Sequence, residues 1–176
     1  MKFAFLDRDG VINKDIGYPS KIKDITLIEG VIESLKILQK LGFHLVIITN
    51  QSGIAKGYLT LKQYYKIENY IDLKLKSNGI TIKKTLFCPH HKDGVVKKYK
   101  KDCKFRKPEI GMLNYIDKCW GVDRKSSILI GDKDSDLECG KTFGLNKCYR
   151  IKSRYKSNSE ITYNSLSHIA THLQKT

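Results

Sequence analysis

The feature that most constrains the fold is an uninterrupted apolar run, Leu-Val-Ile-Ile, at residues 45–48. A strand with one wet face alternates apolar and polar residues, whereas a strand of a parallel sheet is buried on both faces and is apolar throughout. Between runs of this kind, apolar residues recur at helical spacing, for example from Val31 to Leu41 before Gly42. Strands alternating with such helices predict an α/β fold with a doubly wound parallel sheet. We expect strands at 3–6, 45–48, 85–87, 128–130 and 148–151, and helices at 31–41, 60–78, 110–120, 135–143 and 165–173.

The chain is expected to form a single domain over residues 1–176, since this length suits one hydrophobic core and no internal repeat is visible. One long polar segment, residues 88–107, interrupts the regular alternation. Loops of this length are more often functional than idle. We expect this loop to take part in substrate selection.

Charge is the one extreme property of the composition, with a formal net charge of +15. Such a charge suits a nucleic-acid binder, but the lysines are spread along the chain without an arginine-rich arm or zinc-finger spacing. A field that attracts a small anionic substrate is the favoured interpretation. No apolar stretch is long enough to span a membrane, no export signal is visible, and the five cysteines are an odd number. We therefore expect a cytoplasmic protein with reduced or metal-binding thiols, and a monomer by default.

Acidic side chains follow two of the expected strands directly. Asp7 and Asp9 come after the first strand, and Asp132 comes after the strand at 128–130. Ligands of doubly wound sheets bind beyond the carboxyl ends of the strands, so these carboxylates should converge. Oxygen-rich sites of this kind suit Mg²⁺, with one carboxylate as a nucleophile and another as an acid and base in phosphoryl transfer. Asp136 is a further carboxylate near the metal or an acceptor that orients Lys133.

Groups that can bind phosphate follow the strand at 45–48 and precede the helix at 110–120. Thr49 and Ser52 offer hydroxyls, and the backbone of residues 50–53 offers N–H donors. Lys107 can neutralise charge on a phosphoryl group, and Arg106 can hold a phosphate through two donors.

Together these segments resemble the haloacid-dehalogenase (HAD) superfamily of phosphatases with an aspartate nucleophile. The four motifs are Asp-Arg-Asp-Gly-Val-Ile-Asn at 7–13, Thr-Asn-Gln-Ser-Gly at 49–53, Arg-Lys-Pro at 106–108, and Gly-Asp-Lys at 131–133 with Asp136. With Cys-Pro-His-His at 88–91, they resemble more narrowly the D-glycero-D-manno-heptose 1,7-bisphosphate 7-phosphatases. The resemblance thins after Phe143 and implies a Rossmann-like HAD fold without a large cap domain.

The resemblance also implies roles for individual residues. Asp7 would be the nucleophile and Asp9 the general acid and base, and Mg²⁺ would be held by Asp7, Asp132 and the backbone carbonyl of Asp9. The substrate, a small sugar bisphosphate, would contact Asp15, Ile16, Gly17, Tyr18, Thr49, Asn50, Gln51, Ser52, Arg106, Lys107 and Lys133.

A structural zinc ion is also implied, held by a Cys-x-His pair and a Cys-x-Cys pair. Cys88, His90 and Cys103 match, but position 105 is Phe, which cannot bind metal. Either His91, Asp102 or water is the fourth ligand, or zinc is absent and Phe105 packs the loop.

The activity implied is hydrolysis of the 7-phosphate of the heptose bisphosphate, on the route to nucleotide-activated heptose for lipopolysaccharide, capsule or other glycans. Histidinol-phosphate phosphatase is the nearest alternative, although the interval from Cys88 to Cys103 is long for that branch. A further alternative is a polynucleotide 3′-phosphatase, whose nucleic-acid substrate would suit the net charge of +15. A non-catalytic phosphosugar-binding protein on the same fold is disfavoured because both Asp7 and Asp9 are present.

Overall fold

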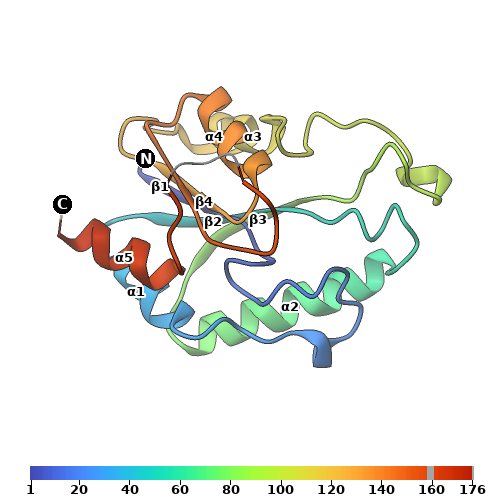
Figure 1. Cartoon of the computed structure of the whole chain (residues 1–176), viewed down its shortest axis with the longest axis horizontal. Helices are drawn as coiled ribbons and strands as arrows, with labels where there is room; N and C mark the ends of the chain where they lie inside the picture. Colours follow the sequence, from blue (N-terminus) through green and yellow to red (C-terminus); the bar gives the residue numbers. More distant parts are fainter. Residues whose placement is uncertain (158–160, 176) are drawn as a thin grey trace.

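The computed structural model describes residues 1–157 and 161–175 and contains a five-stranded sheet in the order β3-β2-β1-β4-β5. Every adjacent pair of strands runs parallel, as the doubly wound α/β prediction requires (Figure 1). The strands are β1 (Phe3–Leu6), β2 (His44–Asn50), β3 (Ile82–Cys88), β4 (Ile128–Gly131) and β5 (Lys147–Arg150). The α-helices are α1 (Val31–Lys40), α2 (Leu61–Ser77), α3 (Gly111–Trp120), α4 (Asp134–Phe143) and α5 (Leu166–Gln174), with short 3₁₀ turns η1 (Ile22–Asp24) and η2 (Lys97–Tyr99).

Helices cover both faces of the sheet, and alternate residues of each strand face opposite layers. In β1, Ala4 and Leu6 belong to a core with α1, α2 and α5, whereas Phe3 and Phe5 belong to a core with α3 and α4. Burial on both faces explains why the central strands are apolar without alternation.

The observed elements match the predicted ones closely, with local signals at their ends. Thr60 caps α2, accepting the N–H of Gln63 while the Gln63 side chain accepts the N–H of Thr60. β3 is longer than predicted and begins at Ile82. Its early residues include Lys83 and Lys84, which are polar because β3 is an edge strand.

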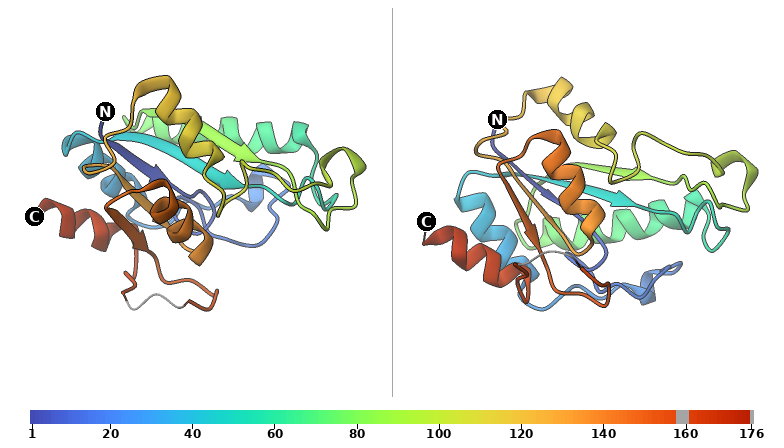
Figure 2. Two further views of the ribbon diagram at one scale, coloured as in Figure 1. Left: turned by 90° about the horizontal axis from the view of Figure 1, so that it is seen from above. Right: turned by 45° about the horizontal axis from the view of Figure 1, so that its top comes forward.

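The chain changes direction across the sheet at β1, which lies between β2 and β4. The carboxyl ends of β1 and β4 are therefore adjacent at a topological switch point, where open α/β sheets bind ligands. Two segments, residues 51–60 and 89–110, extend beyond this edge (Figure 2). They are joined by the N–H groups of Val95 and Val96, which donate to the Ala55 carbonyl at 2.8 and 2.9 Å. Loops rather than a large cap domain surround the strand ends.

No helix in the described part of the chain combines the length and the apolar character that a membrane crossing requires.

Candidate active site

Asp7 lies directly after β1 and is 4% exposed. Its backbone N–H donates to the Ile130 carbonyl of β4 at 2.9 Å, which fixes it between the two strands. The Lys107 ammonium donates to Asp7 Oδ1 at 2.9 Å and to the Ile48 carbonyl at 2.7 Å. It also contacts Asp136 Oδ1 at 2.6 Å. Burial alone would lower the pKa of Lys107, but Asp136 and Asp7 raise it above its usual value, so the ammonium stays charged beside the proposed nucleophile.

A cluster of three buried carboxylates occupies the switch point. Ligand oxygens of Asp7, Asp132 and Asp136 lie within 4.8 Å of one another. Among the described residues, neither carboxylate oxygen of Asp132 has a hydrogen-bond partner, although Asp132 is fully buried. Burial, and then the charge of Asp7, raise the pKa of Asp132 to about 7. Buried oxygens without donors are what a hard divalent cation would satisfy, so the residues present fit Mg²⁺.

Gly10 allows this cluster to form. It adopts φ +93°, and a Cβ at this position would lie 2.5 Å from Asp132 Oδ2. Any side chain would therefore displace the Asp132 carboxylate and strain the backbone.

Asp9 is outside the carboxylate cluster and lines a cavity of about 340 Å³. Its side chain accepts hydrogen bonds from Arg8, from Asn13 at 2.9 Å and from Gln51 at 2.8 Å. Arg8 is fully buried, with its other guanidinium nitrogen 3.5 Å from Glu68. These donors fix the Asp9 carboxyl at the cavity wall, where it can exchange a proton with a bound molecule.

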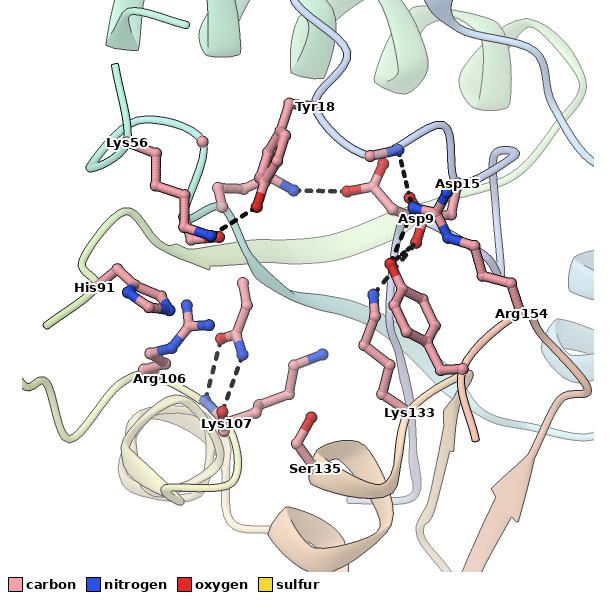
Figure 3. A pocket seen from close by; sticks show the side chains of 16 residues that line it. Asp9, Asp15, Tyr18, Lys56, His91, Arg106, Lys107, Lys133, Ser135 and Arg154 are labelled. Carbon is pink, nitrogen blue, oxygen red and sulfur yellow. Dashed lines mark hydrogen bonds and ion pairs between the residues drawn. The ribbon is translucent and has the colours of Figure 1, made fainter. Parts of the chain in front are cut away.

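The cavity is strongly cationic and is drawn in Figure 3. Its basic lining residues surround the cavity in Figure 3. Lys56, His91 and Arg106 are drawn together at the left, Lys107 lies near Ser135 at the bottom, and Lys133 and Arg154 are at the right. Burial lowers the pKa of Lys133, but Asp7, Asp132 and Asp15 raise it beyond its usual value. A molecule bearing several negative charges fits this lining. Of the predicted substrate contacts, the wall includes Asp15, Gly17, Tyr18, Asn50, Gln51, Ser52, Arg106, Lys107 and Lys133.

Two predicted substrate contacts lie outside the cavity lining. Thr49 is buried in β2, and its hydroxyl accepts the side-chain N–H of Gln51 at 2.9 Å. Ile16 is 54% exposed on the surface. Gln51 lines the cavity, but its amide N–H₂ group is used by Asp9 and Thr49. Asp136 accepts the backbone N–H of Lys133 at 3.0 Å through one carboxylate oxygen. Its other oxygen contacts the ammonium of Lys107, so Asp136 orients the side chain of Lys107 and only the backbone of Lys133.

Several lining residues were absent from the sequence-based prediction, notably Lys56, Ser135, Arg154 and Tyr155. Asp7 and Asp132 directly follow β1 and β4, whereas Arg154 and Tyr155 come several residues after the end of β5 at Arg150. The strand-end rule points to the segment after β5 but does not single out these two residues. Lys56 belongs to the segment after the 49–53 motif, and its ammonium donates to the Tyr18 hydroxyl at 2.9 Å.

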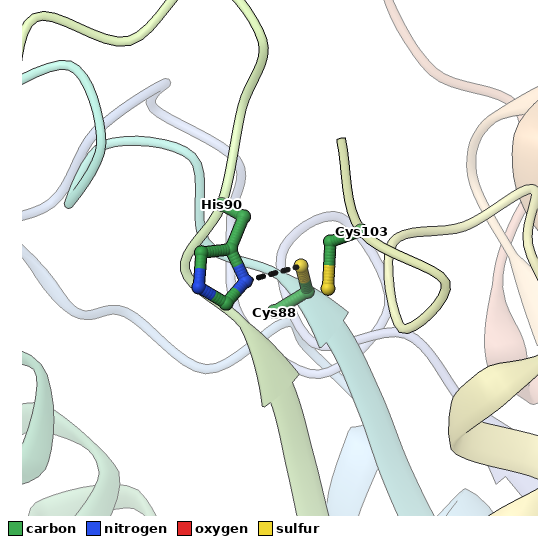
Figure 4. Close-up of side chains that lie close together, drawn as sticks. All are labelled: Cys88, His90 and Cys103. Atoms are coloured by element: carbon green, nitrogen blue, oxygen red, sulfur yellow. Dashed lines mark hydrogen bonds between the residues drawn. The ribbon is translucent and has the colours of Figure 1, made fainter. Parts of the chain in front are cut away.

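The predicted zinc ligands lie together at the start of the 88–107 loop. Ligand atoms of Cys88, His90 and Cys103 fall within 4.8 Å of one another (Figure 4). Burial raises the pKa of the Cys88 thiol to about 12. His91 lies outside this cluster and lines the cavity, and its Nδ1 accepts the Asp93 N–H at 3.1 Å. Phe105 is 39% exposed with its ring against Gly111. Of the predicted ligands, Cys88, His90 and Cys103 are thus brought together as a group that could hold a metal ion.

Known proteins with similar sequences show which family this chain belongs to. A family model described as "Polynucleotide kinase 3 phosphatase" matches residues 2–165. The D-glycero-alpha-D-manno-heptose-1,7-bisphosphate 7-phosphatase of Photorhabdus laumondii is 43% identical over 166 residues, which is 94% of this chain and 90% of that protein. The D-glycero-beta-D-manno-heptose-1,7-bisphosphate 7-phosphatase of Haemophilus influenzae is 42% identical over 139 residues, 79% of this chain and 75% of the relative.

Solved structures share the fold. An HAD-like protein from Mesorhizobium loti has a TM-score of 0.86 at 29% identity, covering 99% of this chain and 87% of that one. The D,D-heptose 1,7-bisphosphate phosphatase of B. bronchiseptica, solved with magnesium and phosphate, has a TM-score of 0.84 at 24% identity, covering 99% of both chains. The chain therefore belongs to the Polynucleotide kinase 3 phosphatase family and, within the HAD phosphatases, to the branch that contains the heptose-1,7-bisphosphate 7-phosphatases.

Proposed function

We propose that this chain hydrolyses the 7-phosphate of D-glycero-D-manno-heptose 1,7-bisphosphate through an aspartyl-phosphate intermediate on Asp7. The observation that carries the proposal is the pairing of a buried Asp7, held by the Lys107 ammonium, with Asp9 on the wall of a cationic cavity. The substrate follows from relatives that are 42–43% identical and bear this activity in their names. A doubly phosphorylated sugar also matches the cationic lining.

In the first step, an Asp7 carboxylate oxygen attacks the phosphorus of the 7-phosphate. The bond from phosphorus to the sugar oxygen breaks, and the Asp9 carboxyl gives its proton to that oxygen. Lys107 remains charged beside Asp7 and offsets negative charge on the transferred group. The hydrogen bonds from Asn13 and Gln51 keep the Asp9 carboxyl at the cavity wall throughout.

In the second step, the Asp9 carboxylate accepts a proton from water, and the water oxygen attacks the phosphorus on Asp7. The bond from phosphorus to the Asp7 oxygen breaks, which releases inorganic phosphate and restores both aspartates. Asp9 is thus an acid in one step and a base in the next.

Asp7 and Asp132 would hold Mg²⁺, together with the Asp9 backbone carbonyl. When bound, the ion supplies positive charge that keeps these carboxylates ionised and balances charge on the phosphoryl oxygens. The two buried oxygens of Asp132, neither of which accepts a hydrogen bond from the described residues, support this assignment.

The 88–107 loop would select the substrate, since it contributes His91, Arg106 and Lys107 to the cavity. The loop would be ordered in part by zinc on Cys88, His90 and Cys103, with solvent as the fourth ligand. Product sugar phosphate would serve the synthesis of nucleotide-activated heptose for surface glycans.

A second candidate function is removal of a 3′-phosphate from a polynucleotide. It is favoured by the family model over residues 2–165 and by the net charge of +15. A nucleic-acid substrate would bind with strong salt dependence, whereas a small sugar bisphosphate would show a much weaker one.

The test is a substrate panel with Mg²⁺. It contains both anomers of the heptose bisphosphate, histidinol phosphate, fructose 1,6-bisphosphate and a 3′-phosphorylated oligonucleotide. We expect the highest kcat/KM for one heptose anomer, and a higher value for any other member would overturn the substrate assignment. Asp7→Asn should abolish phosphate release, and Asp123→Asn, an exposed control, should not. Acid quenching of the wild type should show one added phosphoryl group on the peptide that contains Asp7.

A further inference from the structure

The segment after β5 reaches back to the cavity, and its attachment is specific. Ser153 Oγ donates to the Asp132 carbonyl at 2.8 Å, and the Tyr155 N–H donates to Ser153 Oγ at 3.3 Å. These bonds tie the segment to the end of β4. Arg154 and Tyr155 consequently form part of the cavity wall beside Lys133 (Figure 3).

Asp15 joins this segment to the loop that follows β1. The Tyr155 hydroxyl donates to Asp15 Oδ2 at 2.7 Å, and Arg154 Nη2 donates to Asp15 Oδ1 at 3.2 Å. The Lys133 ammonium lies 3.4 Å from Asp15 Oδ2. Arg154 and Lys133 therefore share the Asp15 carboxylate.

Tyr155 makes a second contact that bears on Lys133. The Lys133 ammonium lies 4.5 Å from the centroid of the Tyr155 ring, within the range of a cation–π interaction. The same ammonium is 3.5 Å from Asp132 Oδ1. Lys133 is therefore held between the carboxylate cluster and the cavity by Asp15, Asp132 and the face of the Tyr155 ring.

Arg154 retains donors for a ligand. Its side chain is 55% exposed, and within residues 1–157 and 161–175 both of its hydrogen bonds start from Nη2. Nε and Nη1 are left to bind an anion. Arg106, on another side of the labelled group, is half-buried and donates to the His90 carbonyl at 3.3 Å.

We propose that Arg154 binds the second phosphate group of the sugar bisphosphate, the one that is not hydrolysed, and that Tyr155 is a positioning residue for Lys133. This inference rests on the proposed function because it assumes a doubly phosphorylated substrate. Arg154 thereby contributes to the preference for a bisphosphate over a monophosphate.

The test of Arg154 measures competition against hydrolysis of p-nitrophenyl phosphate in Mg²⁺. Inhibition constants are determined for fructose 1,6-bisphosphate and fructose 6-phosphate with the wild type, Arg154→Gln, Arg154→Lys and the control Lys152→Gln. We expect Arg154→Gln to reduce the preference for the bisphosphate about tenfold, the size of one charge-assisted contact, and to leave the monophosphate constant near the wild-type value. Arg154→Lys should recover part of the preference, and Lys152→Gln should retain all of it.

An unchanged preference for the bisphosphate in Arg154→Gln would overturn the proposal. So would inhibition by the bisphosphate and by the monophosphate that weakens to the same extent. The outcome is separable from the proposed function. If the wild type fails to hydrolyse heptose bisphosphate, the substrate assignment falls, while the competition ratio still reports on Arg154.

The test of Tyr155 compares kcat of the wild type, Tyr155→Phe and Tyr155→Leu with heptose bisphosphate or, if that sugar is not hydrolysed, with p-nitrophenyl phosphate. Phe keeps the ring over Lys133 and removes the hydroxyl, whereas Leu removes both contacts. We expect kcat to fall in the order wild type, Phe, Leu, with thermal unfolding midpoints that stay together. Equal kcat for all three proteins would refute the positioning role, and so would a kcat loss that follows the unfolding midpoint.

Discussion

The fully buried Asp132 should make the metal-free protein less stable at high pH than at low pH. Its pKa is raised to about 7 by burial and by Asp7, whereas an unfolded chain has the ordinary value of 3.8. The folded protein therefore binds this proton more tightly. The free energy of unfolding that this tighter proton binding contributes is fully present at low pH and is lost as pH rises through about 7. Between about pH 5 and pH 8, linkage gives a loss of about 2–3 kcal/mol from this one group.

Asp132→Asn removes the titration. The buried amide keeps a polar group at the site, but its free energy does not change with pH. In EDTA, the stability of the variant relative to the wild type should therefore rise by about 2–3 kcal/mol between about pH 5 and pH 8. In urea unfolding followed by circular dichroism, this is a relative shift of about 1 M in the midpoint.

Asp117→Asn is the matched control. The pKa of Asp117 is lowered by the Val122 N–H and by Arg124, so its carboxylate is ionised across the whole pH interval. Its replacement should change stability by the same amount at both pH values. A relative stability of Asp132→Asn that is flat or falls with rising pH would refute the reasoning. Mg²⁺ should stabilise the wild type more at the higher pH and have little effect on Asp132→Asn.

Three further outcomes are expected. Lys107→Met should lower the free energy of unfolding by about 3–5 kcal/mol, because Asp7 and Asp136 lose their buried counterion, and a loss in urea unfolding below about 1 kcal/mol would contradict this. Asp9→Asn should reduce kcat for a sugar phosphate about 10²–10⁴-fold and reduce it less for p-nitrophenyl phosphate, whose leaving group needs no proton. Equal losses for the two substrates would remove Asp9 from the acid role. Phe105→Cys should increase the zinc that the purified protein retains in a chelator, measured by elemental analysis, and equal retention would show that position 105 is not beside the metal.

The sequence was a good guide to the fold because each central strand is buried on both faces and each helix has one apolar face. The continuous apolar run in β2 and the Thr60 cap of α2 are local signals that no tertiary contact overrides. The length of β3 was underestimated, since an edge strand tolerates Lys83 and Lys84 and so has a weaker apolar signal.

The site was predictable to the extent that strand ends meet at one edge of the sheet. This rule places Asp7 and Asp132 together and Asp9 at the cavity. It does not give the direction of each side chain: Thr49 points into the protein and bonds to Gln51, and Asp136 pairs with the Lys107 ammonium. Those choices depend on packing between elements that are far apart in sequence.

The hydrogen bond from the Asp7 N–H to the Ile130 carbonyl has a consequence for how the enzyme matures. Asp7 is made before Asp132 on the ribosome, and the carboxylate cluster forms only when β4 pairs with β1 and brings Asp132 beside Asp7. A nascent chain that ends before residue 128 carries the nucleophile but not the cluster. Catalytic competence is therefore a late event of folding, reached only when one of the longest loop closures in the chain has occurred.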